Sequence, residues 1–194
     1  MLKGEIVNLP NLISLIRILM APVLLWLAIT QQPVVYLVVL LFTVFTDVLD
    51  GFLARQLNQI TEMGSHLDSW GDFIVYTVMA ISAWLLWPEI VVKESISFLL
   101  ILFSLIMPVL IGFLKFGVFT SYHTWSVKLA VAVTIVSYVL LFSGWLDWPF
   151  RVAVVVCLYA AIEETGITFI LKHERADVRT IFHAIKLSRV NNKK

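Results

Sequence analysis

The residues best suited to chemistry in this chain are four aspartates that fall close together, at Asp47, Asp50, Asp68 and Asp72. On helices, the first pair would share one face at a spacing of three, and the second pair would share one at a spacing of four. Only about a dozen residues separate Arg55 from Asp68, which predicts two antiparallel helices with their ends together. Carboxylate oxygens favour Mg²⁺, Mn²⁺ or Ca²⁺ over zinc. The sequence therefore predicts a divalent-metal site, and a pair of ions there would suit displacement at phosphorus.

The aspartates stand in a chain that is otherwise strongly apolar. Hydrophobic residues make up 60% of it and charged residues 14%, whereas a soluble domain has roughly a quarter charged residues. Apolar runs near the spanning length of about 20 residues occur at about 12–30, 34–55, 67–87, 95–119, 127–146 and 150–171, with Trp87-Pro88-Glu89 among the breaks. The predicted fold class is an all-α integral membrane bundle of six transmembrane helices. We expect one domain over residues 1–194, with a polar tail at 172–194.

The distribution of positive charge predicts the orientation of this bundle. Of the 14 lysines and arginines, 12 fall on one predicted side, and only Lys93 and Arg151 fall on the other. The positive-inside bias then places both termini in the cytoplasm. Five of the seven tryptophans gather at the opposite surface, as an aromatic belt would, at Trp26, Trp84, Trp87, Trp145 and Trp148. The four aspartates would lie at the cytoplasmic ends of the second and third spans.

The aspartates belong to a longer motif, D-x-x-D-G-x-x-A-R, eight residues, then G-x-x-x-D-x-x-x-D. The chain matches every fixed position, at Asp47, Asp50, Gly51, Ala54, Arg55, Gly64, Asp68 and Asp72. In this motif the chain resembles the CDP-alcohol phosphatidyltransferase family. The resemblance extends more weakly to Pro10-Asn11 and Arg17, which are similar to the start of the family's first span.

The resemblance implies a reaction and a role for each motif residue. Family members transfer a substituted phosphate from a CDP-linked donor, here CDP-diacylglycerol, to an alcohol hydroxyl and release CMP, in phospholipid biosynthesis. It implies a homodimer in the inner cell membrane, with the active site facing the cytoplasm and no nucleic-acid partner. The implied ligands of two Mg²⁺ or Mn²⁺ ions are Asp47, Asp50, Asp68 and Asp72, with Asp72 also the general base. The CDP moiety would be held by Asp50, Gly51, Ala54, Arg55 and Gly64.

The acceptor alcohol is less closely defined than the donor. The short single-domain chain resembles the phosphatidylglycerophosphate synthase branch, which implies glycerol 3-phosphate, with Lys128 and Arg17 as possible phosphate contacts; Lys115 is a further cation on that side. The segment Leu67-Asp68-Ser69-Trp70-Gly71-Asp72 departs from the Leu-Asp-Pro-(Leu/Val)-Ala-Asp form common in enzymes that act on glycerophosphate, cardiolipin and inositol phosphate. Serine, inositol or its phosphate, and phosphatidylglycerol therefore remain open as acceptors.

A structural role is an alternative for several of these residues. Asp68 follows Ser65 by three residues, as the acid of a helix capping box does, and Arg55 and Lys128 could be interface anchors. A non-catalytic scaffold or a cation transporter is the competing class of protein. A transporter would place its acids near mid-membrane, often with inverted repeats, and the sequence shows neither.

Two further features have no assigned role in this scheme. Glu163 and Glu164 fall inside the sixth predicted span, where acids usually face a cavity or a partner. The tail could form an amphipathic surface helix with Val178, Ile181, Phe182 and Ile185 on one side.

Overall fold

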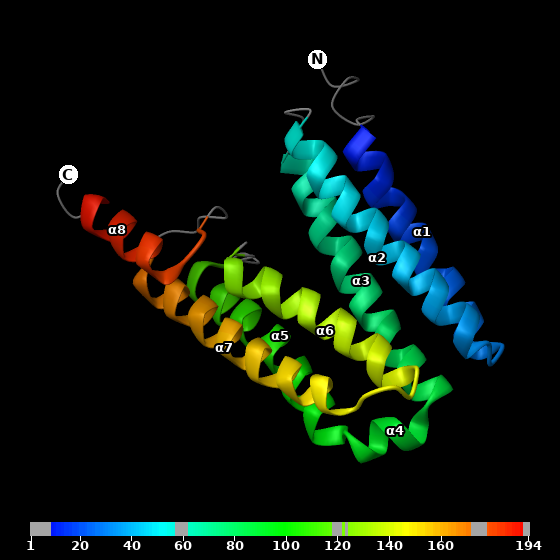
Figure 1. Ribbon diagram of the computed structural model, residues 1–194. Coiled ribbons are helices and arrows are strands. Elements are labelled where there is room, and N and C mark those ends of the chain that lie inside the picture. Colours follow the sequence, from blue (N-terminus) through cyan, green and yellow to red (C-terminus); the bar gives the residue numbers. More distant parts are fainter. Residues whose placement is uncertain (1–8, 57–61, 118–121, 123, 172–177, 192–194) are drawn as a thin grey trace. The chain divides into compact units, whose positions relative to one another are not determined.

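The computed structural model describes residues 9–56, 62–117, 122, 124–171 and 178–191 (Figure 1). Within these ranges, the side chains of 9–15, 47–56, 62–70, 72 and 189–191 lie outside the description. The described residues form helices and no strand. The helices are α1 (Leu9–Ile29), α2 (Pro33–Gln56), α3 (Glu62–Leu86), α4 (Pro88–Lys93), α5 (Ser95–Phe116), α6 (Trp125–Phe142), α7 (Trp148–Ile170) and α8 (Ile181–Asn191).

The predicted all-α class is confirmed, and each predicted span corresponds to one long helix. One difference is α4, a six-residue helix where the sequence suggested only a break. Pro88 occupies its first position, where a missing N–H costs nothing. Glu89 in the first turn and Lys93 in the last both complement the helix dipole. The break between two predicted spans is therefore itself helical.

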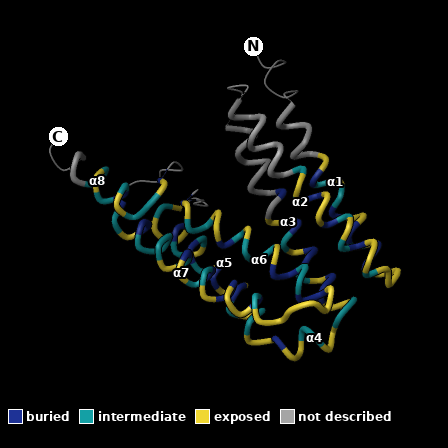
Figure 2. The backbone as a smooth tube through the Cα atoms, viewed as in Figure 1, coloured by how far each residue is buried: buried dark blue, intermediate teal, exposed yellow. Residues whose placement is uncertain are grey.

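Within the described residues, three helices, α5, α6 and α7, are long and apolar enough to cross a membrane. The described apolar stretches in the first three helices are shorter, at Ile16–Ile29, Pro33–Thr46 and Phe73–Leu86. The membrane character predicted from composition is thus supported by these helices. Their outward side chains agree with it, because large apolar residues such as Leu99, Phe103 and Val155 are exposed, as lipid-facing residues would be. Figure 2 shows exposed positions recurring along each of these helices.

The chain divides into two compact units, residues 1–91 and 92–194. In the first unit, α1 packs against both α2 and α3. Leu24, Leu40 and Ala83 are fully buried there. The turn between α1 and α2 is tied to the end of α3, because the Gln31 side chain donates to the Leu85 carbonyl at 3.0 Å. The carboxyl end of α2 and the amino end of α3 therefore lie at the opposite end of this unit.

In the second unit, α7 packs against α5, α6 and α8. Small residues of these helices, among them Gly112, Ala130 and Ala153, are buried, as suits closely packed helices. Near the start of α7, the Phe98 and Phe150 rings pack with centroids 4.8 Å apart.

The residues on the packed side of the tail helix α8 differ from those that the sequence grouped together. The side against α7 is formed by Val178, Ile181, Ala184 and Leu187. Phe182, which the sequence grouped with Val178, Ile181 and Ile185, is not part of this packed side and is 79% exposed. Neighbouring residues of a helix lie about 100° apart, so Phe182 is turned away from the side on which Ile181 packs.

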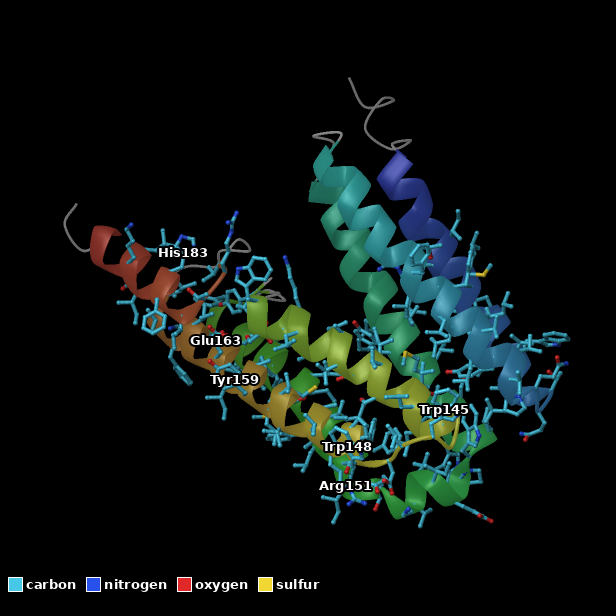
Figure 3. All side chains as sticks on the ribbon, in the orientation of Figure 1. Trp145, Trp148, Arg151, Tyr159, Glu163 and His183 are labelled. Atoms are coloured by element: carbon cyan, nitrogen blue, oxygen red, sulfur yellow. The ribbon has the colours of Figure 1, made fainter. Side chains whose placement is uncertain are left out.

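Both cations predicted on the side opposite the motif are ion-paired. Arg151 Nη2 lies 2.7 Å from Glu94 Oε1, and Lys93 Nζ lies 3.3 Å from Asp147 Oδ2. The Arg151 side chain is labelled in Figure 3. The Glu94 carboxylate is buried, and the hydrogen bond from Arg151 lowers its pKa below the usual value, with Ser97 adding a second hydrogen bond. This pair ties the start of α5 to the start of α7.

We predict that Glu94→Gln lowers the stability of the protein at neutral pH by about 1–2 kcal/mol, since Arg151 is partly solvated. A depressed folded-state pKa contributes stability above the unfolded value of 4.5, and the contribution is lost as pH falls through the folded value. In detergent, the thermal midpoint of the native chain should therefore exceed that of the variant at pH 7, and this difference should shrink as the pH is lowered to 3. The control is Glu89→Gln, an exposed acid nearby. Equal midpoints for native chain and Glu94→Gln at pH 7 would contradict this assignment.

Candidate active site

The two halves of the motif lie on two helices that meet at one end of the first unit. Asp47 to Arg55 occupy the last turns of α2, and Gly64 to Asp72 occupy the first turns of α3. Five residues, 57–61, separate the two helices. Figure 1 shows the end of α2 beside the start of α3, at the end of the unit where α1 begins. The helical placement on which the metal-site prediction depends is therefore confirmed for the backbone.

Helical backbone at these positions fixes how the aspartates are spaced. Asp47 and Asp50 lie three apart on one helix, and Asp68 and Asp72 lie four apart on the next, so each pair shares a helix face. The side chains of all eight motif residues lie outside the described residues, and their convergence on a metal stays a prediction. Among the side chains that the structure does describe, no three His, Cys, Asp or Glu residues come together as a metal site.

Arg17 is the predicted phosphate contact that the structure brings to the motif. It lies on α1 and is only 2% exposed. Its Nη1 atom lies 3.7 Å, and its Cδ atom 3.8 Å, from the point where a Cβ atom on Gly71 would stand. Gly71 is the residue before Asp72 on α3. A cation from the first helix therefore lies directly against the aspartate-bearing turn.

Lys128, the other predicted phosphate contact, belongs to the second unit. It lies in the first turn of α6 and is exposed. Its Nζ atom lies 5.3 Å from the centre of the Trp125 ring, a cation–π arrangement. Lys128 thus lies at the end of an apolar helix, with its side chain against an aromatic ring.

Glu163, which the sequence left without a role, joins three helices of the second unit (Figure 3). Its carboxylate accepts a hydrogen bond from the Ser126 hydroxyl and one from the Ile181 backbone N–H at 3.0 Å. Thr124 caps the same end of α6 by accepting from the Val127 N–H at 3.2 Å. The neighbouring Glu164 carboxylate accepts from the Tyr122 backbone N–H. Protein partners on two other helices therefore account for the Glu163 carboxylate within an apolar helix.

Sequence reasoning could have found part of this arrangement. A threonine directly before an apolar run is a helix-start signal, and Thr124 has that place before α6. The partner of Glu163 could not be read from the sequence, because Ser126 lies 37 positions away. Lys115 also has a structural role, because its Nζ atom donates to the carbonyls of Thr168, Phe169 and Leu171 at 2.9–3.1 Å. A lysine that satisfies the last carbonyls of a helix is a C-terminal cap.

The family model for CDP-alcohol phosphatidyltransferases matches residues 7–175. The chain therefore belongs to the CDP-alcohol phosphatidyltransferase family, as the motif resemblance predicts. The match includes the whole motif and all the helices from α1 to α7.

Among curated relatives, a CDP-diacylglycerol–glycerol-3-phosphate 3-phosphatidyltransferase of Aquifex aeolicus is 37% identical over 94 residues, 48% of this chain and 52% of the relative. The enzyme of the same name from Pseudomonas fluorescens is 38% identical over 74 residues, 37% of this chain and 38% of the relative. A CMP-forming cardiolipin synthase of Rattus norvegicus is 41% identical over 76 residues, 39% of this chain and 25% of the relative. The chain thus matches about half or less of the length of these relatives. No solved structure matches the chain.

We predict that Gly71 tolerates alanine but not leucine. An alanine Cβ would make ordinary contact with Arg17 and Ile18 at 3.6–3.8 Å, whereas a leucine would push into the buried guanidinium. Overpacking of this kind costs about 1–3 kcal/mol. Thermal unfolding of the purified variants should show a lower midpoint for Gly71→Leu and a near-native midpoint for Gly71→Ala. A native midpoint for Gly71→Leu would show that Arg17 does not pack against this turn.

Proposed function

We propose that this chain is a metal-dependent enzyme that transfers a phosphatidyl group from CDP-diacylglycerol to glycerol 3-phosphate and releases CMP. The observation that carries the proposal is the placement of the complete family motif on two helix ends separated by five residues. Such a placement allows acids from α2 and α3 to act on one substrate. The named activity of the Aquifex aeolicus relative supports the same donor and acceptor.

The chemistry assigned to the chain's residues is a displacement at phosphorus. The acceptor hydroxyl oxygen attacks the phosphorus that bears diacylglycerol, the bond from that phosphorus to the oxygen of CMP breaks, and CMP leaves with the electron pair. Asp72 takes the proton of the attacking hydroxyl as general base, which typically contributes 10²–10⁴-fold to the rate. Gly51 and Gly64 give the nucleotide access to bare backbone, and with Asp50 and Ala54 they would line the CDP site. Arg55 would make a charge-assisted contact to a phosphate of the donor.

The donor set fits a pair of hard divalent ions. Two acids on each of two adjacent helix ends supply oxygen ligands of the type that Mg²⁺ and Mn²⁺ prefer, and we assign Asp47, Asp50, Asp68 and Asp72 to hold them. Bound there, two such ions would stabilise the negative charge on the pyrophosphate during displacement. They would also offset the cost of placing four carboxylates beside apolar spans.

The acceptor assignment draws on Arg17 and Lys128. Arg17 lies buried against the turn that carries Asp72, and a buried guanidinium can bind the phosphate of glycerol 3-phosphate through two parallel hydrogen bonds. Lys128 is exposed and can reach a soluble anion. The second candidate acceptor is phosphatidylglycerol, because the cardiolipin synthases of rat and human are 41% and 40% identical to this chain over 76 residues.

The membrane arrangement proposed with this function has six spans, formed by α1, α2, α3, α5, α6 and α7. Both termini and the active site would face the cytoplasm of the inner membrane, and the chain would act as a homodimer. The orientation draws on the count of lysines and arginines, 12 on the side predicted to carry the motif against only Lys93 and Arg151 on the other. The positive-inside bias depends on this count and places the side with more of these cations in the cytoplasm.

We predict that Asp72→Asn lowers CMP release by at least roughly 10²-fold while the thermal midpoint stays near native, because the proton acceptor is lost and the size of the side chain is kept. The measurement is CMP release from CDP-diacylglycerol by detergent-purified protein. The matched control is Asp147→Asn, which removes an exposed acid at the start of α7 and should leave the rate unchanged. Native turnover in Asp72→Asn would remove Asp72 from the mechanism.

The acceptor is tested with the native chain and a panel of glycerol 3-phosphate, serine, inositol, inositol phosphate and phosphatidylglycerol. We expect CMP release with glycerol 3-phosphate only, and its loss on chelation by EDTA with recovery on added Mg²⁺ or Mn²⁺. Arg17→Gln should raise the KM for glycerol 3-phosphate by roughly tenfold or more, the loss expected for one charged hydrogen-bonding partner. Release with phosphatidylglycerol alone would establish the second candidate acceptor, and silence across the panel would contradict the proposed reaction.

A further inference from the structure

The C-terminal helix α8 is held firmly on the end of the second unit. Val178 and Ala184 are fully buried, and Ile181 and Leu187 pack with them against the core formed by Tyr122, Ile167 and Leu171. Gly166 allows the close approach, because a Cβ atom there would stand only 3.1 Å from Ile181 Cδ1. Two hydrogen bonds fix the start of α8, from the Ile181 N–H to Glu163 and from the Trp125 N–H to the Arg179 carbonyl at 3.2 Å.

This docking places α8 where the candidate membrane spans end. Lys115, near the end of α5, reaches the last carbonyls of α7, and Trp125 is the first residue of α6. The end of α5, the start of α6 and the end of α7 therefore lie together, and α8 packs against the last turns of α7. Since α5, α6 and α7 are each long and apolar enough to cross a membrane, their shared end would fall at the boundary between lipid and water.

The outer face of α8 carries one aromatic ring and one cation, and a second cation stands just before the helix. Phe182 is 79% exposed, and Arg179 and Lys186 are also exposed. Phe182 and Lys186 lie four residues apart and share one side of α8, and Arg179 lies two residues before its first residue. The α8 sequence contains no acid. We call the surface of Arg179, Phe182 and Lys186 the outer α8 face.

We propose that the outer α8 face binds the headgroups of anionic phospholipids in the membrane that holds the chain. An exposed phenylalanine flanked by basic residues suits the boundary between headgroups and acyl chains, with the ring inserted and the cations at the phosphates. The two cations favour anionic over neutral headgroups, because a neutral headgroup has no net negative charge to balance them. A symmetric dimer contact through this face is disfavoured, because it would bring the cations of one copy against the same cations of the other.

The test uses the full chain in nanodiscs of phosphatidylcholine alone and in nanodiscs with about one third phosphatidylglycerol. Hydrogen–deuterium exchange is followed in peptides covering 178–191, with peptides from α5, α6 and α7 reporting the fold. We expect exchange in α8 to slow by roughly tenfold in the anionic nanodiscs, as two surface cations allow. The variant Arg179→Gln/Lys186→Gln should lose this difference. The control Lys93→Gln, which removes one charge at the other end of the unit, should keep it.

A charge-preserving variant, Arg179→Lys/Lys186→Arg, provides a second test if the double glutamine variant disturbs packing. Its exchange in α8 should still be slower in the anionic nanodiscs. Phosphatidylcholine nanodiscs with added inorganic phosphate separate a lipid from a soluble anion, and we expect no slowing there. Equal exchange in the two lipid compositions would overturn the proposal. The proposal would also be overturned if free phosphate alone slowed the exchange of α8. The same holds if the slowing required two copies of the chain per nanodisc in either lipid composition.

Discussion

The short separation between α2 and α3 is the constraint on which the rest of the site depends. With five residues between them, the end of one helix cannot be far from the start of the next, because an extended chain covers at most about 3.3–3.6 Å per residue. The two halves of the motif are thus held at one end of the first unit. The turn at Gln31 and its bond to Leu85 hold the opposite end, so the three helices keep their relative direction.

Charge is the second constraint, because the chain is apolar over most of its length. Several described charges that lie in or beside an apolar helix have a partner suited to them. Glu94 is paired with Arg151, Glu163 accepts from Ser126 and Ile181, and Lys115 donates to three carbonyls. The motif aspartates would follow the same rule if divalent cations were their partners. In this account, metal binding and the tolerance of four acids at a membrane surface have one common explanation.

The sequence predicts the long helices well, because apolar runs near membrane length have few alternatives. It also predicts that the motif residues lie on two helix ends, since their fixed spacing suits a helix and only a short segment separates the two halves. It misses α4, because six residues with a proline at the start look like a plain break. It also misplaces Phe182, whose side depends on where α8 begins and on Gly166 and Glu163, which lie far away in sequence. The packing of Arg17 against Gly71 likewise requires knowledge of which helices meet. Propensity and spacing therefore define where the helices lie in the sequence, while long-range contacts determine which side of each helix is packed.

If the proposed function is right, aspartates from α2 and α3 meet at one pair of metal ions. Electron paramagnetic resonance of the purified chain titrated with Mn²⁺ measures this directly. We expect two equivalents to bind and to give the spectrum of a spin-coupled pair. Both Asp50→Asn on α2 and Asp68→Asn on α3 should abolish the coupling. Two uncoupled ions, with each variant losing only its own ion, or no bound Mn²⁺ at all, would contradict this expectation.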